Sequence, residues 1–84
     1  MVEKLLLEIY LPATEKSYSV RLPAGLNVHA AAVLAGMALS EASEGLFMPS
    51  RNCMLFWKDT GRGLNARKTL WESGVQNGSR LILI

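Results

Sequence analysis

Apolar and polar residues alternate along two runs near the start of the chain, at residues 4–11 and 17–22. Alternation with a period of two is typical of a strand that buries one face. The polar segment 12–16 between the runs contains Pro12, and proline is common in turns. The two runs therefore predict a β-hairpin. The side chains expected on its buried face are Leu5, Leu7, Ile9, Leu11, Tyr18, Val20 and Leu22.

A helix is predicted over residues 28–42, which are rich in Ala, Leu and Met. Asn27 precedes this segment, and its side chain can accept a hydrogen bond from an N–H of the first turn. Gly45 is expected to stop the helix, because glycine readily adopts the left-handed conformation found at helix ends. The expected buried stripe has helical spacing and consists of Val28, Ala31, Ala32, Ala35 and Leu39.

The second half of the chain predicts two more strands, over residues 52–58 and 80–84. Residues 52–58 carry apolar side chains on both faces, so we expect this strand to be central in its sheet. A turn at 59–63 follows it, with room for a short strand around Leu64. The Asn-Gly pair at 77–78 is a strong turn signal just before the last strand.

Thr69 and Glu72 have the spacing of a capping box, in which two side chains satisfy N–H groups at a helix start. A one-turn helix is expected there. The order of the predicted strands and helices along the chain indicates an α+β fold, with a mixed sheet of four to five strands packed on one helix. We expect a single domain over residues 1–84. The strand after the crossover helix is expected to run parallel to one before it.

This element order is that of the β-grasp, or ubiquitin-like, fold, and residues 69–84 (TLWESGVQNGSRLILI) carry the resemblance in detail. In that family a Thr-Leu pair opens a one-turn helix, an apolar residue follows five positions after the Leu, and an apolar strand closes the sheet. The ending most resembles the YukD/EsaB proteins. These are small cytosolic ubiquitin-like components of Gram-positive type VII secretion systems.

The resemblance implies a non-enzymatic, cytoplasmic adaptor that docks onto proteins, with partners among the components of the secretion machinery. Conjugating and sulfur-carrying members of the superfamily end in an exposed Gly-Gly, whereas this sequence ends in Leu83-Ile84. We therefore expect neither conjugation nor sulfur transfer. An alternative stays open, in which the chain is a ubiquitin-like structural subunit of a multicomponent monooxygenase or another enzyme complex.

The composition bears on membrane spans, disulfides and metal sites. The uncharged run 28–39 is interrupted by Gly36 and is too short to span a membrane, which takes roughly 20 residues. Cys53 is the only cysteine, so no internal disulfide is expected. Together with His29 it supplies two of the four ligands that structural zinc requires, so we expect no metal or cofactor. Cys53 is expected to be a small buried side chain and His29 to face solvent.

The triplet Asp59-Thr60-Gly61 matches the catalytic triplet of aspartic proteases, whose chemistry needs two carboxylates that share a proton. The triplet lies in a polar turn, and its residue types are ordinary for turns. Gly61 and Gly63 do not open a helix after a strand, as a phosphate-binding loop requires. No catalytic residue is therefore expected.

The net charge is +2, and the basic excess lies in the second half of the chain. The excess is mild and lacks the aromatic and basic signature of nucleic-acid binding. We expect a surface that is solvated or faces an acidic protein, and no binding of nucleic acid. The residues concerned are Arg51, Lys58, Arg62, Arg67 and Lys68.

Half of the residues are hydrophobic, which is more than one small core hides, so we expect apolar surface. The side of the helix opposite the sheet carries Val33 and Met37 in place of polar residues, which predicts an exposed patch. Ala32 and Gly36 are four apart and small enough to let another helix approach closely. We expect a homodimer or a partner contact here, unless loop 46–48 folds over the helix.

The outer face of the sheet is the second expected docking surface, since β-grasp proteins typically bind partners there. Tyrosine and tryptophan are frequent interface anchors. The alternative is that Phe56 and Trp71 are ordinary core aromatics. The residues expected at this surface are Leu6, Tyr10, Met54, Phe56 and Trp71.

Overall fold

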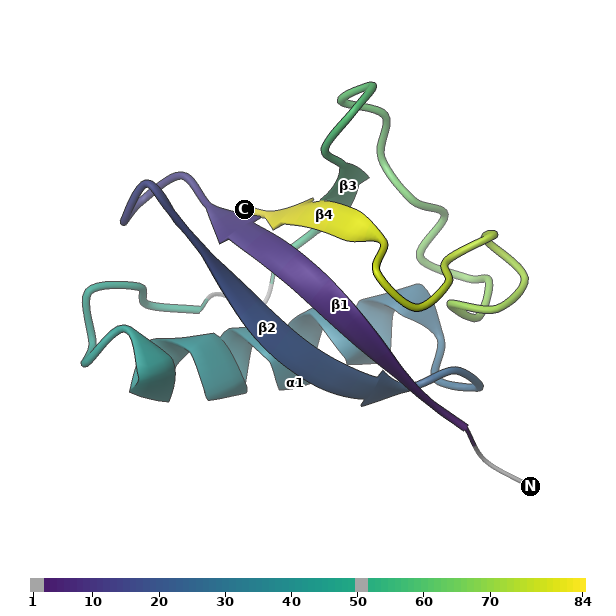
Figure 1. The fold of residues 1–84 in the computed structure, drawn as a ribbon, viewed down its shortest axis with the longest axis horizontal. Coiled ribbons are helices and arrows are strands. Elements are labelled where there is room, and N and C mark those ends of the chain that lie inside the picture. Colours follow the sequence, from purple (N-terminus) through teal and green to yellow (C-terminus); the bar gives the residue numbers. More distant parts are fainter. Residues whose placement is uncertain (1–2, 50–51) are drawn as a thin grey trace.

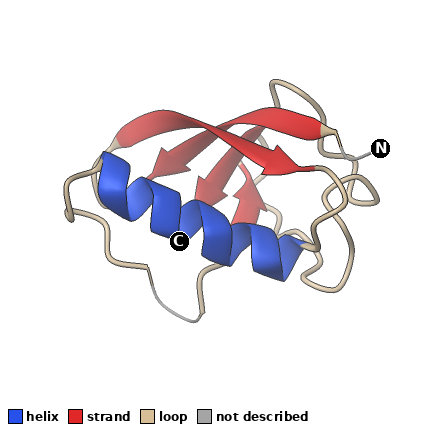
Figure 2. Cartoon of the chain, turned by 90° about the horizontal axis from the view of Figure 1, so that it is seen from below, coloured by secondary structure: helices blue, strands red, loops and turns tan. Residues whose placement is uncertain are grey.

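The computed structural model describes residues 3–49 and 52–84, in which a four-stranded sheet packs on one helix (Figure 1). The elements are β1 (Lys4–Leu11), β2 (Lys16–Pro23), α1 (Val28–Ala42), β3 (Leu55–Trp57) and β4 (Arg80–Leu83). The strand order is β2-β1-β4-β3, with β1 and β4 parallel and the other neighbours antiparallel. Figure 2 shows α1 lying across one face of the sheet. The predicted α+β arrangement is confirmed, with four strands.

β1 and β2 form the expected hairpin, and their bounds lie within one residue of the predicted ones. The register sets apolar residues opposite one another on the face toward α1. The apolar side chains of β1 on this face are at most 3% exposed. A slip of one residue would turn them to solvent, so burial fixes the register. The facing pairs are Leu5–Leu22, Leu7–Val20 and Ile9–Tyr18.

The helix has the predicted bounds and the predicted N-cap. The Asn27 side-chain oxygen accepts a hydrogen bond from the Ala30 N–H at 2.8 Å. At the other end, the Gly45 N–H donates to the Ser40 carbonyl at 2.9 Å, which closes the last turn. The helix ends at Ala42, and in the turn that follows Gly45 takes the expected left-handed conformation (φ 82°), as does Glu44 (φ 55°).

The core lies between α1 and the inner face of the sheet. The predicted stripe of α1 is buried, and it consists mostly of alanines, which let the helix approach the sheet closely. Each fully buried leucine or isoleucine contributes roughly 1.5–3 kcal/mol relative to an exposed one. The largest fully buried side chains are Leu7, Ile9, Leu11, Leu22, Leu39, Leu55, Leu70, Leu81, Leu83 and Val75.

The third strand differs from its prediction in length and in place. β3 covers only Leu55–Trp57 and pairs within the sheet with β4 alone, so the expectation of a central strand is wrong. The chain after β3 folds back along its outer edge, where the Trp57 N–H donates to Arg62 and the Leu64 N–H donates to Leu55. This return segment therefore supplies backbone partners on the edge of β3 that does not face β4.

The short strand expected around Leu64 is reduced to one isolated bridge between Phe56 and Gly63. The parallel pair is also not formed by the first strand after the helix. It is β4 that lies parallel to β1, with Glu8 opposite Arg80. β1 and β4 are therefore the two central strands of the sheet.

The capping box is confirmed in both directions. The Thr69 N–H donates to Glu72 Oε1 at 2.9 Å, and the Glu72 N–H donates to Thr69 Oγ1 at 3.0 Å. The hydrogen bond from the Thr69 N–H, together with one from the Thr69 side chain, lowers the pKa of the Glu72 carboxyl. The segment makes a single hydrogen-bonded turn, closed by the Ser73 N–H on the Thr69 carbonyl at 3.0 Å, rather than a separate helix.

Candidate functional site

A row of apolar side chains crosses the outer face of the sheet. The register places Tyr10 of β1 opposite Ile82 of β4, and Ile82 opposite Phe56 of β3. All three are half-buried, and their chain neighbours Leu81 and Leu55 are buried toward α1. Because side chains alternate along a strand, the row faces away from the helix. We call Tyr10, Ile82 and Phe56 the outer row.

Sequence reasoning identified two members of the outer row and missed Ile82. The signal was present, because alternation along residues 80–84 puts Ile82 on the face opposite Leu81 and Leu83. Its place between Tyr10 and Phe56 depends on β4 lying between β1 and β3. That order comes from pairings between distant segments, which local patterns do not fix.

Charged groups border the outer row. The Lys58 ammonium lies over the Tyr10 ring, 4.9 Å from its centroid, in a cation–π contact. Such contacts contribute about 0.5–1 kcal/mol at exposed sites. Glu8 and Arg80 are both exposed and lie opposite each other on β1 and β4. Each precedes a member of the outer row, Tyr10 or Ile82, by two residues and therefore lies on the same face. An apolar centre with a polar rim is the usual anatomy of a protein interface.

Three other expected residues of this surface lie apart from the outer row. Leu6 is at the opposite end of β1, next to the Asn77-Gly78 turn, where the Gly78 N–H donates to the Leu6 carbonyl at 2.7 Å. Met54 is half-exposed just before β3, and its backbone pairs with Ile84. Trp71 is 63% exposed, so it is not a core aromatic.

A second apolar surface lies on α1. Val33, Leu34 and Met37 are 39%, 44% and 61% exposed, respectively. In the loop segment 46–48, Phe47 is buried, while Leu46 and Met48 are exposed. The loop therefore does not cover these side chains. We call Val33, Leu34 and Met37 the helix patch.

A groove of about 700 Å³ runs between the helix patch and β2. Leu34 and Met37 line its helix side, and Val20 and Leu22 line its sheet side. Arg21 and Glu41 bring one charge of each sign to the same groove.

Ala32 and Gly36 do not belong to this patch, because both are buried. A Cβ placed on Gly36 would lie 3.0 Å from the Pro49 Cβ and 3.9 Å from the Phe47 ring. The small residues thus make room for the chain's own loop and not for a second helix. We correct the expected docking surface by removing these two positions.

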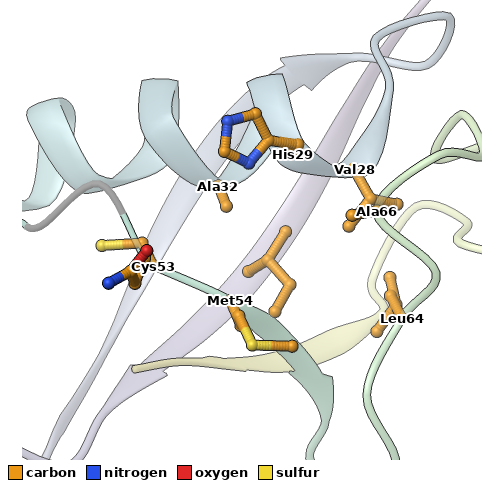
Figure 3. Close-up of a pocket in the computed structure, with 9 residues that line it drawn as sticks. Val28, His29, Ala32, Cys53, Met54, Leu64 and Ala66 are labelled. Atoms are coloured by element: carbon orange, nitrogen blue, oxygen red, sulfur yellow. The ribbon is translucent and has the colours of Figure 1, made fainter.

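A smaller pocket of about 230 Å³ lies between the first half of α1, the segment before β3 and residues 64–66 (Figure 3). Its walls are mostly apolar, and His29 lies at its edge, exposed as expected. Cys53 is buried, also as expected. The lining residues are Val28, His29, Ala32, Asn52, Cys53, Met54, Leu55, Leu64 and Ala66.

The structure offers no support for chemistry at the Asp-Thr-Gly triplet. Asp59 is exposed in a turn that the Gly61 N–H closes on the Trp57 carbonyl at 2.7 Å. Within the described residues, no group of three or more His, Cys, Asp and Glu side chains could hold a metal ion.

The basic residues are divided between two places. Lys58 lies over the sheet, whereas Arg67 and Lys68 lie beside the start of α1, where the Lys68 carbonyl accepts from the Val28 N–H. Arg51 lies outside the described residues. In the part of the chain that the structure describes, no helix has the length and apolar character needed to cross a membrane.

Comparison with known proteins was made by sequence and by structure. No protein-family model and no curated protein matches the sequence. Among solved structures, the EccD5 ubiquitin-like domain from Mycobacterium xenopi matches with a TM-score of 0.80 and 19% identity, covering 98% of this chain and 93% of that one. The ubiquitin-like domain of EccD1, a type VII secretion protein of Mycobacterium tuberculosis, matches with a TM-score of 0.75 and 18% identity, covering 98% of both.

A third match is a chain of the MycP5-free ESX-5 inner membrane complex, with a TM-score of 0.79 and 18% identity. It covers 96% of this chain and 20% of the longer one. Ubiquitin-like domains of other proteins match as well. Because the sequence identity to each of these structures is below 20%, the matches establish the fold of this chain and not a role shared with any of them.

The chain therefore has the ubiquitin-like β-grasp fold, which is typical of non-catalytic domains. Within that class it resembles the EccD ubiquitin-like domains of mycobacterial type VII secretion systems. The sequence had suggested the same kind of secretion system through the YukD/EsaB proteins.

Proposed function

We propose that residues 1–84 act as one ubiquitin-like unit, a non-enzymatic cytoplasmic adaptor that docks onto components of a type VII-like secretion machine. The observation that carries the proposal is the outer row, an apolar centre with a charged border on a face that α1 does not cover. The structural likeness to a domain within the ESX-5 inner membrane complex supports secretion-machinery proteins as partners.

The size of the molecule is compatible with this mode of action. The fold measures 33 × 26 × 23 Å, and a standard interface takes about 800 Å² from each partner. The area of one broad face is close to this interface area, so one partner with a standard interface would cover one face of the molecule. In this proposal Tyr10 and Phe56 are the anchors, because large aromatic side chains at the centre of an interface contribute most of the binding energy.

The opposite side of the molecule is left for a second contact. We propose that the helix patch, with the groove beside it, mediates self-association or a further docking contact. Its three side chains are exposed, and His29 is the one ionisable residue between Val28 and Ser40. A partner on the outer row and a second copy on the helix patch can bind at the same time, since the two surfaces lie on opposite layers.

Site-specific photo-crosslinking in the native host tests the proposal. A photoreactive residue at Tyr10 or at Phe56 is expected to trap a component of the secretion machinery, identified by mass spectrometry. Exposed Gln76, in the turn before β4, is the matched control position and is expected to trap none. Crosslinks to subunits of a hydroxylase would favour the monooxygenase alternative, and equal crosslinking from Gln76 would contradict docking through the outer row.

A further inference from the structure

The 230 Å³ pocket has three walls held in place by the fold. Val28 and Ala32 form the helix wall, Leu55 belongs to the strand wall, and Leu64 with Ala66 forms the third wall (Figure 3). Backbone hydrogen bonds join these walls, from the Val28 N–H to the Lys68 carbonyl at 2.8 Å and from the Leu64 N–H to the Leu55 carbonyl at 3.0 Å. The cavity is therefore preformed. We call it the α1–β3 pocket.

The volume and the lining restrict what can enter. Pockets for drug-sized ligands and cofactors span about 300–1,000 Å³, so about 230 Å³ is too small for them. No side chain of the lining is an acid, a lysine or an arginine, and most are apolar. A charged group placed inside would lose its hydration without a partner of opposite charge. One large apolar side chain fits both the size and the lining.

The chain beside Ala66 carries basic charge. Arg67 and Lys68 directly follow this lining residue, and the described stretches that form the walls, residues 26–36, 52–57 and 62–68, contain no acidic residue. The nearest carboxylates along the chain are Asp59, in the turn between 57 and 62, and Glu72, whose pKa is lowered mainly by Thr69 and also by the charge of Lys68. Basic charge on this side of the pocket attracts acidic groups on a partner and repels basic ones.

We propose that the α1–β3 pocket receives a single large apolar side chain of a partner polypeptide, and that the residues flanking this anchor in the partner are acidic. The anchor fills the cavity while its neighbours meet Arg67 and Lys68 beside Ala66. The pocket opens between α1 and β3, whereas the outer row faces away from α1. The inference thus concerns a second site and does not depend on the proposed function.

The first test titrates the ¹⁵N-labelled full chain with the blocked peptide Asp-Glu-Trp-Glu-Asp, followed by NMR. Saturable shifts are expected at the amides of Val28, Ala32 and Leu64. Replacing the peptide's Trp by Ala is expected to weaken binding by about tenfold or more, because burial of the anchor is lost. A peptide with Lys at all four flanking positions is expected to bind more weakly, with the difference shrinking as salt rises.

Variants of the chain assign the site. Ala66 is exposed and lines the pocket, so Ala66→Trp fills the cavity from its rim without altering the core, and it is expected to abolish the shifts. Ala13→Trp, at an exposed turn position, is the matched control and is expected to bind as the unchanged chain does. Combined Arg67→Glu and Lys68→Glu is expected to remove the preference for acidic flanks.

Several results would overturn the inference. These are the absence of saturable shifts at millimolar peptide, shifts confined to other surfaces, unchanged binding by Ala66→Trp, and equal binding of the Trp and Ala peptides or of the acidic and basic ones. Phe56→Glu separates the two proposals. It is expected to leave peptide binding intact while removing partner crosslinking at the outer row.

Discussion

Replacing Gly36 by leucine tests how the loop after α1 is held. Any side chain there must enter space already taken, since its Cβ would lie 3.0 Å from the Pro49 Cβ and 3.8 Å from Cys53 Sγ. The loop has to lift, and Phe47, now 7% exposed, loses its burial. Burying a phenylalanine contributes about 1.5–3 kcal/mol. Leucine recovers about 1 kcal/mol through its better helix propensity, which leaves a net loss of about 0.5–2 kcal/mol.

Two assays measure this change. Thermal unfolding is expected to shift down by about 2–16 °C, since 1 kcal/mol corresponds to about 4–8 °C in a domain of this size. Cys53, buried under the same loop, is expected to react with a thiol reagent about 2 to 30 times faster, as the open form becomes more populated.

Ala42→Leu, at an exposed position on the same helix, is the matched control and is expected to change neither the midpoint nor the rate. If Gly36→Leu unfolds at the unchanged temperature and its thiol reacts at the unchanged rate, the loop does not depend on Gly36 and the reasoning fails.

Four further predictions concern the capping box, the helix patch and the core. Thr69→Ala is expected to lose about 1 kcal/mol in urea unfolding, because an N-cap side chain is removed, and an unchanged midpoint would contradict this. The Thr69 hydrogen bonds hold the pKa of Glu72 below its ordinary value of 4.5. The ionised Glu72 carboxylate therefore stabilises the folded state above pH 4.5, and this stabilisation is lost as the pH falls through the lowered pKa. With Glu72→Gln, the free energy of unfolding is therefore expected to fall less steeply as the pH is lowered. The same pH dependence in both proteins at acidic pH would contradict this prediction. Val33→Glu or Met37→Glu is expected to leave the fold intact and to reduce self-association in sedimentation. A chain that is monomeric at high concentration with and without these changes removes the dimer proposal. Leu70→Ala, at a fully buried position, is expected to cost about 2–5 kcal/mol in denaturant unfolding, and a cost near zero would show that Leu70 is not in the core.

The sequence pattern correctly predicted the elements that are determined by residues close together in the chain. The hairpin follows from alternation, and α1 from composition and the Asn27 cap, so both were confirmed to within a residue. The capping box at Thr69 and Glu72 was also confirmed, because its two hydrogen bonds lie within four residues.

The errors arose where distant segments meet. β3 is an edge strand with residues 58–64 returning along its open side, and apolar residues on both faces do not by themselves distinguish this from a central strand. Gly36 was taken as surface because the loop that packs on it is not visible from helical spacing. The outer row needed the strand order before Ile82 could join Tyr10 and Phe56.

The parallel pairing of β1 with β4 has a consequence for the growing polypeptide. Glu8 and Arg80 are neighbours in the sheet, although almost the whole sequence separates them. Until residues 80–83 have left the ribosome, one edge of β1 has no partner strand, and Leu81 and Leu83 are missing from the core. Contacts this far apart in sequence form late and slow the search for the native state. Folding of this domain therefore waits for β4, and β1 is exposed to pairing with other chains until β4 has emerged.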